Sequence, residues 1–493
     1  MNRFVDALGP LPRLGTLAAA LLLAGCAVVP PYAPPQVDTG AGFKQAAATA
    51  AESAAWKRAE PRDGADRGAW WRVLGDARLD ALMAEAERAN PALQAGLARL
   101  AQARAALGGA EAARAPQVEG GLGATRARAS PAALGLPAGT DVPPQTLLRA
   151  QIGASYEVDL FGRVRHEVTA ARADVARAEG LQRALLLSIQ ADVAQSWLTR
   201  RALGAEITLL ERTVALREEG LQIVSRRFAA GEIAELDVAR ARTELAVARA
   251  EMLVLVQRRS AVEHALAVLV GRAPAELDRL LPPPAADEGT PVFEPVQIPP
   301  GLPSELLERR PDVAAAERAM AAANARIGVA QTAWFPRLSI TALLGFEAER
   351  AGDLFTGASR TWALGPLAGT ALAATLFDGG RREADRARAL AAYDEAAATY
   401  RQTVLGALRE VEDALAALRL LAQQAAEHAQ AVSASERAAR LSALRYRAGQ
   451  VSYFEVIDAE RQVLAARRAV AQTERERALA TVALIRALGG GWA

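Results

Sequence analysis

The chain has 493 residues, and its 58 Lys and Arg nearly balance its 56 Asp and Glu, giving a formal net charge of +2. A charge this balanced creates no field that would recruit nucleic acid or an anionic substrate, so we expect no nucleic-acid partner. Apolar residues make up 51% and aromatic residues only 5%, so most of the apolar surface comes from small and aliphatic side chains. This composition favours long helices over a thick globular core.

Residues 1–25 have the pattern of a secretory signal peptide. Arg3 and Arg13 precede an apolar run, Leu14 to Ala24, that is too short to cross a bilayer. The run ends in LAGC, residues 23–26, which resembles a bacterial lipoprotein cleavage box. This resemblance implies that Cys26, the single cysteine, carries an N-terminal lipid, and Ala27 after it implies the outer membrane. A chance cysteine after an ordinary signal peptide is the alternative.

Residues 26–68 contain four prolines close together and many small side chains, which predicts an extended tether. The first structural unit follows at 69–271. It opens with a helix over 79–114, followed by two segments with period-two alternation that predict strands at 117–128 and 146–160.

The first unit ends in a long helical hairpin over 164–271, which turns near Gly231. Its first helix of about 65 residues would be about 100 Å long. Its apolar residues recur every three or four positions, the spacing of coiled coils. Residues 272–302 are rich in proline and predict an extended linker.

A second copy of the unit occupies 303–493. It repeats the helix at 303–334, the strands at 337–350 and 362–376, and the hairpin at 380–488 with its turn near Gly449. Pro91 and Pro311 lie 220 residues apart (311 − 91), and Gly231 and Gly449 lie 218 apart (449 − 231). A duplication with helices and strands in fixed order predicts two copies of one structural unit.

Four strands are too few to close a barrel, and open strand edges are not tolerated in hydrocarbon. Three chains would supply twelve strands, within the range of outer-membrane barrels. We therefore expect a homotrimer with a mixed fold: a 12-stranded membrane β-barrel plus a long α-helical barrel that forms a periplasmic tunnel.

Chemistry-bearing motifs are lacking. His166, His264 and His428 are scattered singly, no cluster has metal-ligand spacing, and no phosphate-binding glycine loop follows a strand. We expect no enzymatic activity, no metal and no cofactor beyond the lipid on Cys26.

Several runs resemble the outer-membrane factors of tripartite efflux pumps, the OprM/NodT branch of the TolC family. The resemblance covers essentially the whole chain after Cys26. The matching runs are GLPSELLERRPDV at 301–313, AANARIG at 322–328, FPRLS at 335–339, YEVDLFGR at 156–163, and the shorter Trp70-Trp71 and Leu74-Gly75-Asp76.

The resemblance implies a trimeric channel in the outer membrane that extends into the periplasm. Its partners would be a periplasmic adaptor (membrane fusion) protein, an inner-membrane RND transporter and outer-membrane lipid. The channel would catalyse nothing and would conduct small toxic compounds passively to the exterior.

The family's periplasmic gate maps onto the second hairpin. By position, Asp458 resembles the gate aspartate and Phe454 the apolar constriction one turn earlier. Because they are four residues apart, they share a helix face. Arg240 is the equivalent of Asp458 in the first copy, so we expect these two residues to pair between neighbouring hairpins. Glu455 and Asp237 are weaker gate candidates, for which a solvated helix surface is the alternative.

The family's adaptor grooves lie at the same turns. The residues that match them are Arg227, Gly231, Arg447 and Gly449. For the two glycines, the backbone geometry of a turn is an equally good explanation. Two other functions stay open: a periplasmic lipoprotein scaffold or adaptor without a pore, and a channel for type I protein secretion.

Overall fold

The computed structural model describes residues 32–33, 43–44, 68–279, 308–364 and 372–490. The signal peptide, Cys26, most of the tether and residues 280–302 of the linker lie outside this part, so these sequence predictions stay predictions. The chain divides into two compact units: residues 1–36 with 100–178 and 316–400, and residues 37–99 with 179–315 and 401–493. Each unit is described by itself.

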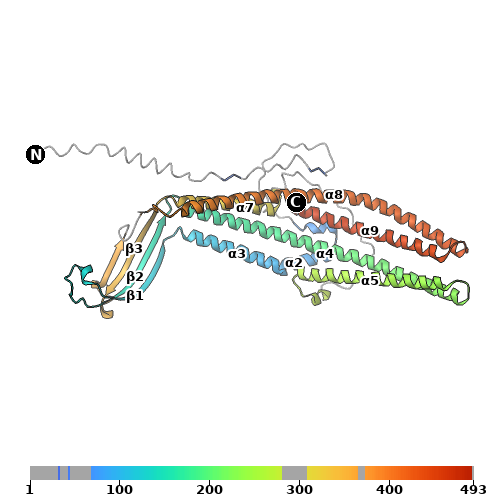
Figure 1. Cartoon of the computed structure of the whole chain (residues 1–493), viewed down its shortest axis with the longest axis horizontal. Helices are drawn as coiled ribbons and strands as arrows, with labels where there is room; N and C mark the ends of the chain where they lie inside the picture. Colours follow the sequence, from blue (N-terminus) through green and yellow to red (C-terminus); the bar gives the residue numbers. More distant parts are fainter. Residues whose placement is uncertain (1–31, 34–42, 45–67, 280–307, 365–371, 491–493) are drawn as a thin grey trace. The chain divides into compact units, whose positions relative to one another are not determined.

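The compact unit that includes residues 100–178 and 316–400 contains one antiparallel sheet (Figure 1). The three long predicted strands are present within two residues of their expected ends, as β1(Gln117–Ala127), β2(Gln145–Val158) and β3(Arg337–Ala348). The fourth, expected over 362–376, begins earlier and forms two short strands, β4(Arg360–Leu364) and β5(Leu372–Ala373), with 365–371 outside the described residues. The order is β1-β2-β3-β4, and β5 also pairs with β3.

The strand register separates the side chains by polarity. One row across the sheet consists of Gly120, Ile152, Leu344 and Trp362, each directly opposite the next. In this row Ile152 is 57% exposed, Leu344 63% and Trp362 73%. Because side chains alternate between faces, the adjacent row lies on the other face. That row has no large apolar side chain and consists of two glycines and two polar residues: Gly121, Gln151, Gly345 and Thr361.

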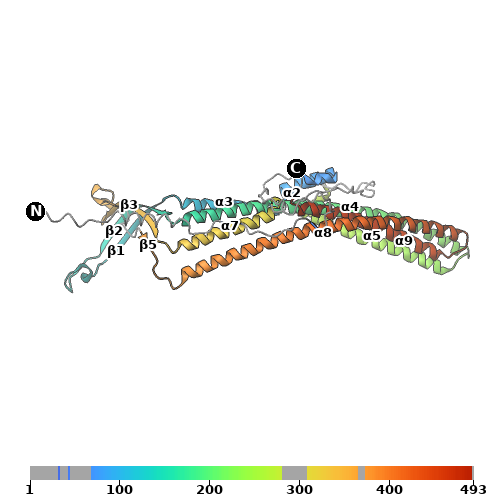
Figure 2. The same cartoon turned by 90° about the horizontal axis from the view of Figure 1, so that it is seen from above.

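The helices come in matched pairs. The short helices α3(Pro91–Ala112) and α7(Pro311–Thr332) each have 22 residues. The hairpin helices also match in length: α4(Arg163–Ala229) and α8(Arg381–Arg447) have 67 residues each, and α5(Glu235–Leu269) and α9(Tyr453–Ala487) have 35 each. In Figures 1 and 2, α4 turns back into α5 and α8 into α9. The prediction of two repeats, each with long helices and strands, is confirmed.

The duplication extends to individual ion pairs. Arg249 on α5 bonds to Glu218 on α4, and Arg467 on α9 bonds to Glu436 on α8. Both members of the second pair lie 218 residues after those of the first (436 − 218 and 467 − 249). Each hairpin is therefore held by the same cross-link at the same level.

The single helix expected over 79–114 is wrong in one respect, because Asn90 divides it into α2(Ala77–Ala89) and α3. Asn90 has an extended backbone, as favoured before a proline. Its side-chain oxygen accepts hydrogen bonds from the backbone N–H groups of Ala92 and Leu93, which caps α3. Its amide nitrogen donates to the carbonyl oxygen of Leu269 at 2.7 Å, which ties this break to the end of α5.

The described residues of the tether and linker make contacts and local structure that their composition did not predict. Phe43 is 8% exposed and packs in an apolar cluster with Val411 and Leu484. Tyr32 donates a hydrogen bond to the Glu317 carboxylate at 3.0 Å. The linker begins with a short 3-10 helix, η3(Pro274–Arg279), which starts at a proline whose fixed φ suits a first helical turn. The segment 274–279 is thus helical where an extended chain was expected. For the tether, most of which lies outside the described residues, the extended chain stays a prediction.

Candidate functional site

The turns of the two hairpins have the same backbone. Gly231 and Gly449 both have φ of 74°, a left-handed conformation that favours glycine. Each donates its N–H to the carbonyl three residues earlier at 2.9 Å. The next residues, Glu232 and Gln450, donate to carbonyls five residues back. This pair of hydrogen bonds ends each helix in a Schellman motif, so the turn geometry alone explains the two glycines.

Arg227 connects the turns of the two repeats. Its Nη1 donates to the hydroxyl of Tyr446 at 2.8 Å, and its guanidinium lies 5.4 Å from the centre of that ring. Its Nε donates to Glu232 at 2.9 Å. Arg447, by contrast, is exposed, and no ion pair is recorded for it in the described part of the chain. Of the four residues predicted for adaptor contact, one is thus engaged between the repeats and three lie exposed at the turns.

The candidate gate residues do not pair as expected within one chain. The guanidinium of Arg240 lies over the ring of Phe454, 5.2 Å from its centre, and 3.9 Å from a carboxylate oxygen of Asp237. Asp458 instead accepts a hydrogen bond from Gln462 at 2.8 Å. Within one chain Arg240 and Asp458 do not pair, because Arg240 lies against the ring face of Phe454 and Asp458 accepts a hydrogen bond from the next turn of α9. A pair between hairpins of neighbouring chains stays a prediction. Glu455 is exposed.

A buried carboxylate joins the hairpins just beyond the turns. Glu244 on α5 is 5% exposed and accepts hydrogen bonds from both ends of the Arg461 guanidinium on α9. Arg217 on α4 lies 3.3 Å from the same carboxylate and donates to the backbone carbonyl of Glu244 at 2.7 Å. This cluster was not predicted from the sequence, although Glu244 and Glu251 on α5 and Arg461 and Arg468 on α9 share a heptad spacing that indicates it.

Tyr453 fills the space between this cluster and the turns. Its ring lies 5.4 Å from that of Tyr446, and burial raises the pKa of its hydroxyl to about 12. A β-carbon on Gly220 would lie 2.9 Å from the Tyr453 hydroxyl oxygen, which is too close. Gly220 thus makes room on α4 for an aromatic side chain of α9.

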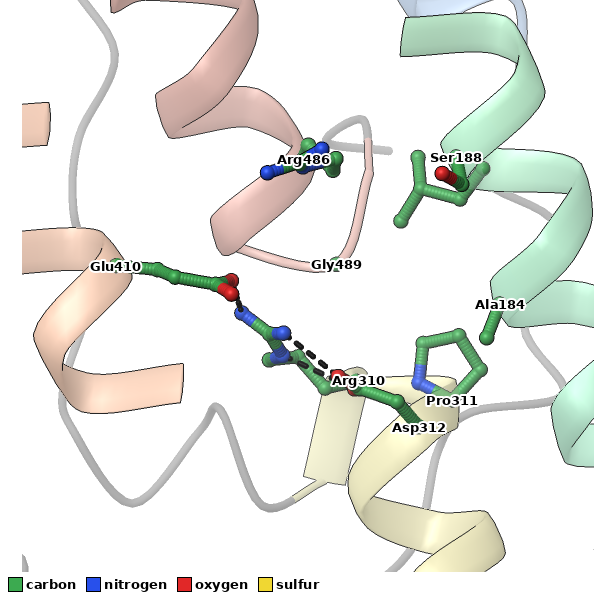
Figure 3. Close-up of a pocket in the computed structure, with 9 residues that line it drawn as sticks. Ala184, Ser188, Arg310, Pro311, Asp312, Glu410, Arg486 and Gly489 are labelled. Atoms are coloured by element: carbon green, nitrogen blue, oxygen red, sulfur yellow. Dashed lines mark hydrogen bonds and ion pairs between the residues drawn. The ribbon is translucent and has the colours of Figure 1, made fainter. Parts of the chain in front are cut away.

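A second cluster of charges surrounds Arg310, at the start of α7 (Figure 3). Its guanidinium donates to both oxygens of Asp312 at 2.6 and 3.0 Å, to Glu410 on α8 at 2.8 Å, and to the Ala487 carbonyl at the end of α9 at 2.9 Å. The cluster borders a cavity of about 240 Å³. One side chain of the run ERRPDV therefore joins the beginning of one helix to two others.

Within the described ranges, no three or more His, Cys, Asp or Glu side chains gather as a metal site. Nor does any helix in those ranges combine the length and apolar character needed to cross a membrane.

Comparisons with known proteins assign the family. A model of the family described as "Outer membrane efflux protein" matches residues 82–272 and 302–490. Outer membrane protein OprJ of Pseudomonas aeruginosa is 32% identical over 497 residues, 98% of this chain and 96% of OprJ. Pyoverdine export outer membrane protein OpmQ of the same organism is 32% identical over 489 residues, 98% of this chain and 97% of OpmQ.

A solved structure of the outer-membrane channel OprN is also similar, with 31% identity and a TM-score of 0.80. The similarity covers 95% of this chain and 100% of the OprN chain. The sequence resemblance to efflux channels is thereby confirmed, as is the expectation of a transport protein without enzymatic activity. The chain belongs to the outer membrane efflux protein family.

Proposed function

We propose that three copies of this chain join their sheets into one barrel and form the outer-membrane exit channel of a tripartite efflux pump. The observation that carries the proposal is the division of the sheet into an apolar and a polar face. Ile152, Leu344 and Trp362 stand exposed side by side on one face. Exposed apolar rows on a sheet with open edges are stable in lipid once the edges are paired with another sheet.

The opposite face suits a water-filled lumen. Arg149 lies opposite Glu347 in the register, and their side chains bond at 2.8 Å. Gln151 donates to the same carboxylate at 2.9 Å. Polar groups that bond along the inside of a barrel can remain hydrated while solutes pass. The polar face therefore supports passive conduction of small compounds.

The hairpin turns supply the periplasmic end in this proposal. Phe454 is 45% exposed in the single chain. Three copies around an axis would gather three Phe454 rings as an apolar constriction, with three Asp458 carboxylates one turn further on. Apolar constrictions and acidic rings are the usual means by which pores restrict solutes and select ions. Arg240 holds the Phe454 ring, and Asp237 and Glu455 contribute peripheral charge.

The partners follow from the same proposal. The exposed residues Gly231, Arg447 and Gly449 would meet a periplasmic adaptor, which connects the channel to an inner-membrane RND transporter. Arg227 would shape that surface through its bond to Tyr446. Cys26 would carry a lipid that anchors the chain to the outer membrane. OpmQ is a pyoverdine export protein; for this chain we propose small molecules as the class of cargo.

Ion conductance of the purified full-length chain in planar bilayers tests the proposal. We expect discrete channel openings, and we expect Phe454→Ala to raise the conductance because it removes the apolar constriction. Phe228→Ala is the matched control, since Phe228 is a similarly exposed phenylalanine (42%) on α4, at the turn of the first repeat.

Absence of any conductance from a correctly folded protein would favour a scaffold without a pore. Equal conductance of the wild type and Phe454→Ala would refute the proposed constriction at Phe454 but not the proposed channel. A pore that passes folded or unfolded polypeptide would instead favour protein secretion.

A further inference from the structure

Helix α9 carries three arginines at exact heptad spacing, Arg461, Arg468 and Arg475, and each meets an acidic residue of the first repeat. Arg461 bonds to Glu244, and Arg468 bonds to Glu251 at 2.9 Å, both on α5. Arg475 lies 3.8 Å from Glu206 on α4. Seven residues after Glu251, α5 has Arg258 rather than an acid, and α4 supplies the third partner instead. We call these three pairs the arginine ladder.

The pair nearest the turns can separate cheaply. If α9 moved away from α5, Glu244 would lose Arg461 but keep Arg217 at 3.3 Å, from its own hairpin. The Arg461 side chain is 51% exposed and would be solvated at once. Neither charge would be left buried and uncompensated, so this pair can break and re-form reversibly.

The middle pair is also open to water. The side chains of Arg468 and Glu251 are 27% and 41% exposed. Water can replace their single hydrogen bond as the helices part, so this pair adds little resistance.

The third pair is different, because in the described part of the chain no second cation lies within ion-pair distance of its acid. Glu206 is 2% exposed and follows the buried Leu203 on α4 by one helical turn. Its Oε1 has no hydrogen-bond partner among the described residues, and Arg475 is the cation placed beside it. Withdrawing Arg475 would leave a buried carboxylate without compensation, which costs far more than breaking a solvated pair.

We propose that the Arg475–Glu206 pair is the fulcrum of the gate. When the gate opens, the part of α9 between its turn and Arg468 separates from the first repeat, and α9 stays fixed at Arg475. Arg475 and Glu206 are thus positioning residues that set how far the opening extends along α9. The inference rests on the proposed gate, because it assumes that the turns part during transport.

Distances between paired nitroxide labels on the full-length chain test this. Labels at the exposed positions Ala250 and Ala465 report α5–α9 separation below the fulcrum, and labels at Ala261 and Glu476 report it above. Labelled chains are diluted with unlabelled chains, so that only distances within one chain are measured. Arg461→Gln should increase the long-distance population of the lower label pair by roughly threefold, the size expected for one solvated ion pair, and leave the upper pair unchanged.

Arg475→Gln should lengthen the upper distance as well, because the unpaired Glu206 carboxylate becomes solvated when the helices part. The double variant Glu206→Gln with Arg475→Gln should lengthen the upper distance less, since it removes the anchoring pair but leaves no buried charge. The difference between the two variants separates the effect of the charge from a general loss of packing. The proposal is overturned if Arg475→Gln affects only the lower distance, or if the double variant keeps the wild-type upper distance. The distance measurement is independent of the bilayer conductance assay. If the chain conducts in that assay but the label distances do not change in the variants, the fulcrum is refuted and the channel is not.

Discussion

Replacing Arg310 by alanine should produce one of the largest losses of stability available in this chain. The guanidinium is 9% exposed and makes four hydrogen bonds between 2.6 and 3.0 Å, three to carboxylate oxygens and one to the Ala487 carbonyl. These bonds hold the pKa of Arg310 above its ordinary value despite the opposing effect of burial, so the charge is retained. Removing the cation leaves two partly buried carboxylates facing each other.

Breaking a buried ion cluster by removing one member costs about 3–5 kcal/mol. Arg381→Ala is the matched control, because its side chain is 84% exposed and lies 3.9 Å from Asp385. Its loss should cost at most about 1 kcal/mol. Arg310→Lys should be intermediate, since an ammonium group cannot reproduce the planar two-pronged contact with Asp312.

Thermal and urea unfolding of the purified protein in detergent micelles, followed by circular dichroism at the helical band, measures these differences. A free energy of unfolding for Arg310→Ala within about 1 kcal/mol of that for Arg381→Ala would contradict this expectation. In that case the bonds around Arg310 would contribute no more than an exposed pair.

Three further variants test local structure by the same unfolding assay. Asn90→Ala should cost about 1–2 kcal/mol because α3 loses its cap, and a loss no larger than that of an exposed alanine substitution would contradict the capping role. Gly271→Ala should lower the free energy of unfolding more than Gly231→Ala. Both glycines have positive φ (70° and 74°), but only at Gly271 would a β-carbon meet another residue, the Ala89 carbonyl oxygen at 2.2 Å. Equal losses of stability would show that this contact relaxes freely. Tyr453→Phe should flatten the fall in stability between pH 10 and pH 12, because the folded wild type keeps its hydroxyl protonated in a range where the unfolded chain ionises (pKa 10.0 against about 12). If the stability of the wild type and of Tyr453→Phe fell equally between pH 10 and pH 12, the raised pKa of Tyr453 would be contradicted.

Much of the fold could be predicted because the ends of its helices and strands are set by local sequence. Prolines at 91 and 311 start α3 and α7, and glycines at 231 and 449 follow the ends of α4 and α8 with the left-handed turn that glycine favours. Period-two alternation located the strands, and the register of the sheet shows that it also sorts polar from apolar side chains. The repeat offset then transferred each assignment from one copy to the other.

The contacts between the repeats could not be predicted in the same way. Helical periodicity shows which face of α9 is apolar, but it does not show which helix that face meets or at what level. The expected Arg240–Asp458 pair assumed that equivalent residues face each other, whereas Arg461 bonds to Glu244, 217 residues earlier, and Arg240 meets Phe454, 214 later. A shift of a few residues is enough to replace one partner by another.

Phe43 illustrates a different limit. The proline-rich composition around it indicated an extended tether, and composition averages over neighbours. The packing of the Phe43 side chain in a cluster with Val411 and Leu484 depends on tertiary structure, which local composition does not describe.

The central claim is that the sheet becomes part of a barrel with lipid outside and water inside. Collision accessibility of nitroxide labels placed singly along β3, from Arg337 to Ala348, in protein reconstituted into vesicles tests it most directly. We expect labels at Ile340, Ala342 and Leu344 to be relaxed mainly by oxygen dissolved in lipid, and labels at Thr341, Leu343 and Gly345 mainly by a water-soluble nickel reagent. Equal accessibility of both sets to the water-soluble reagent would contradict the account.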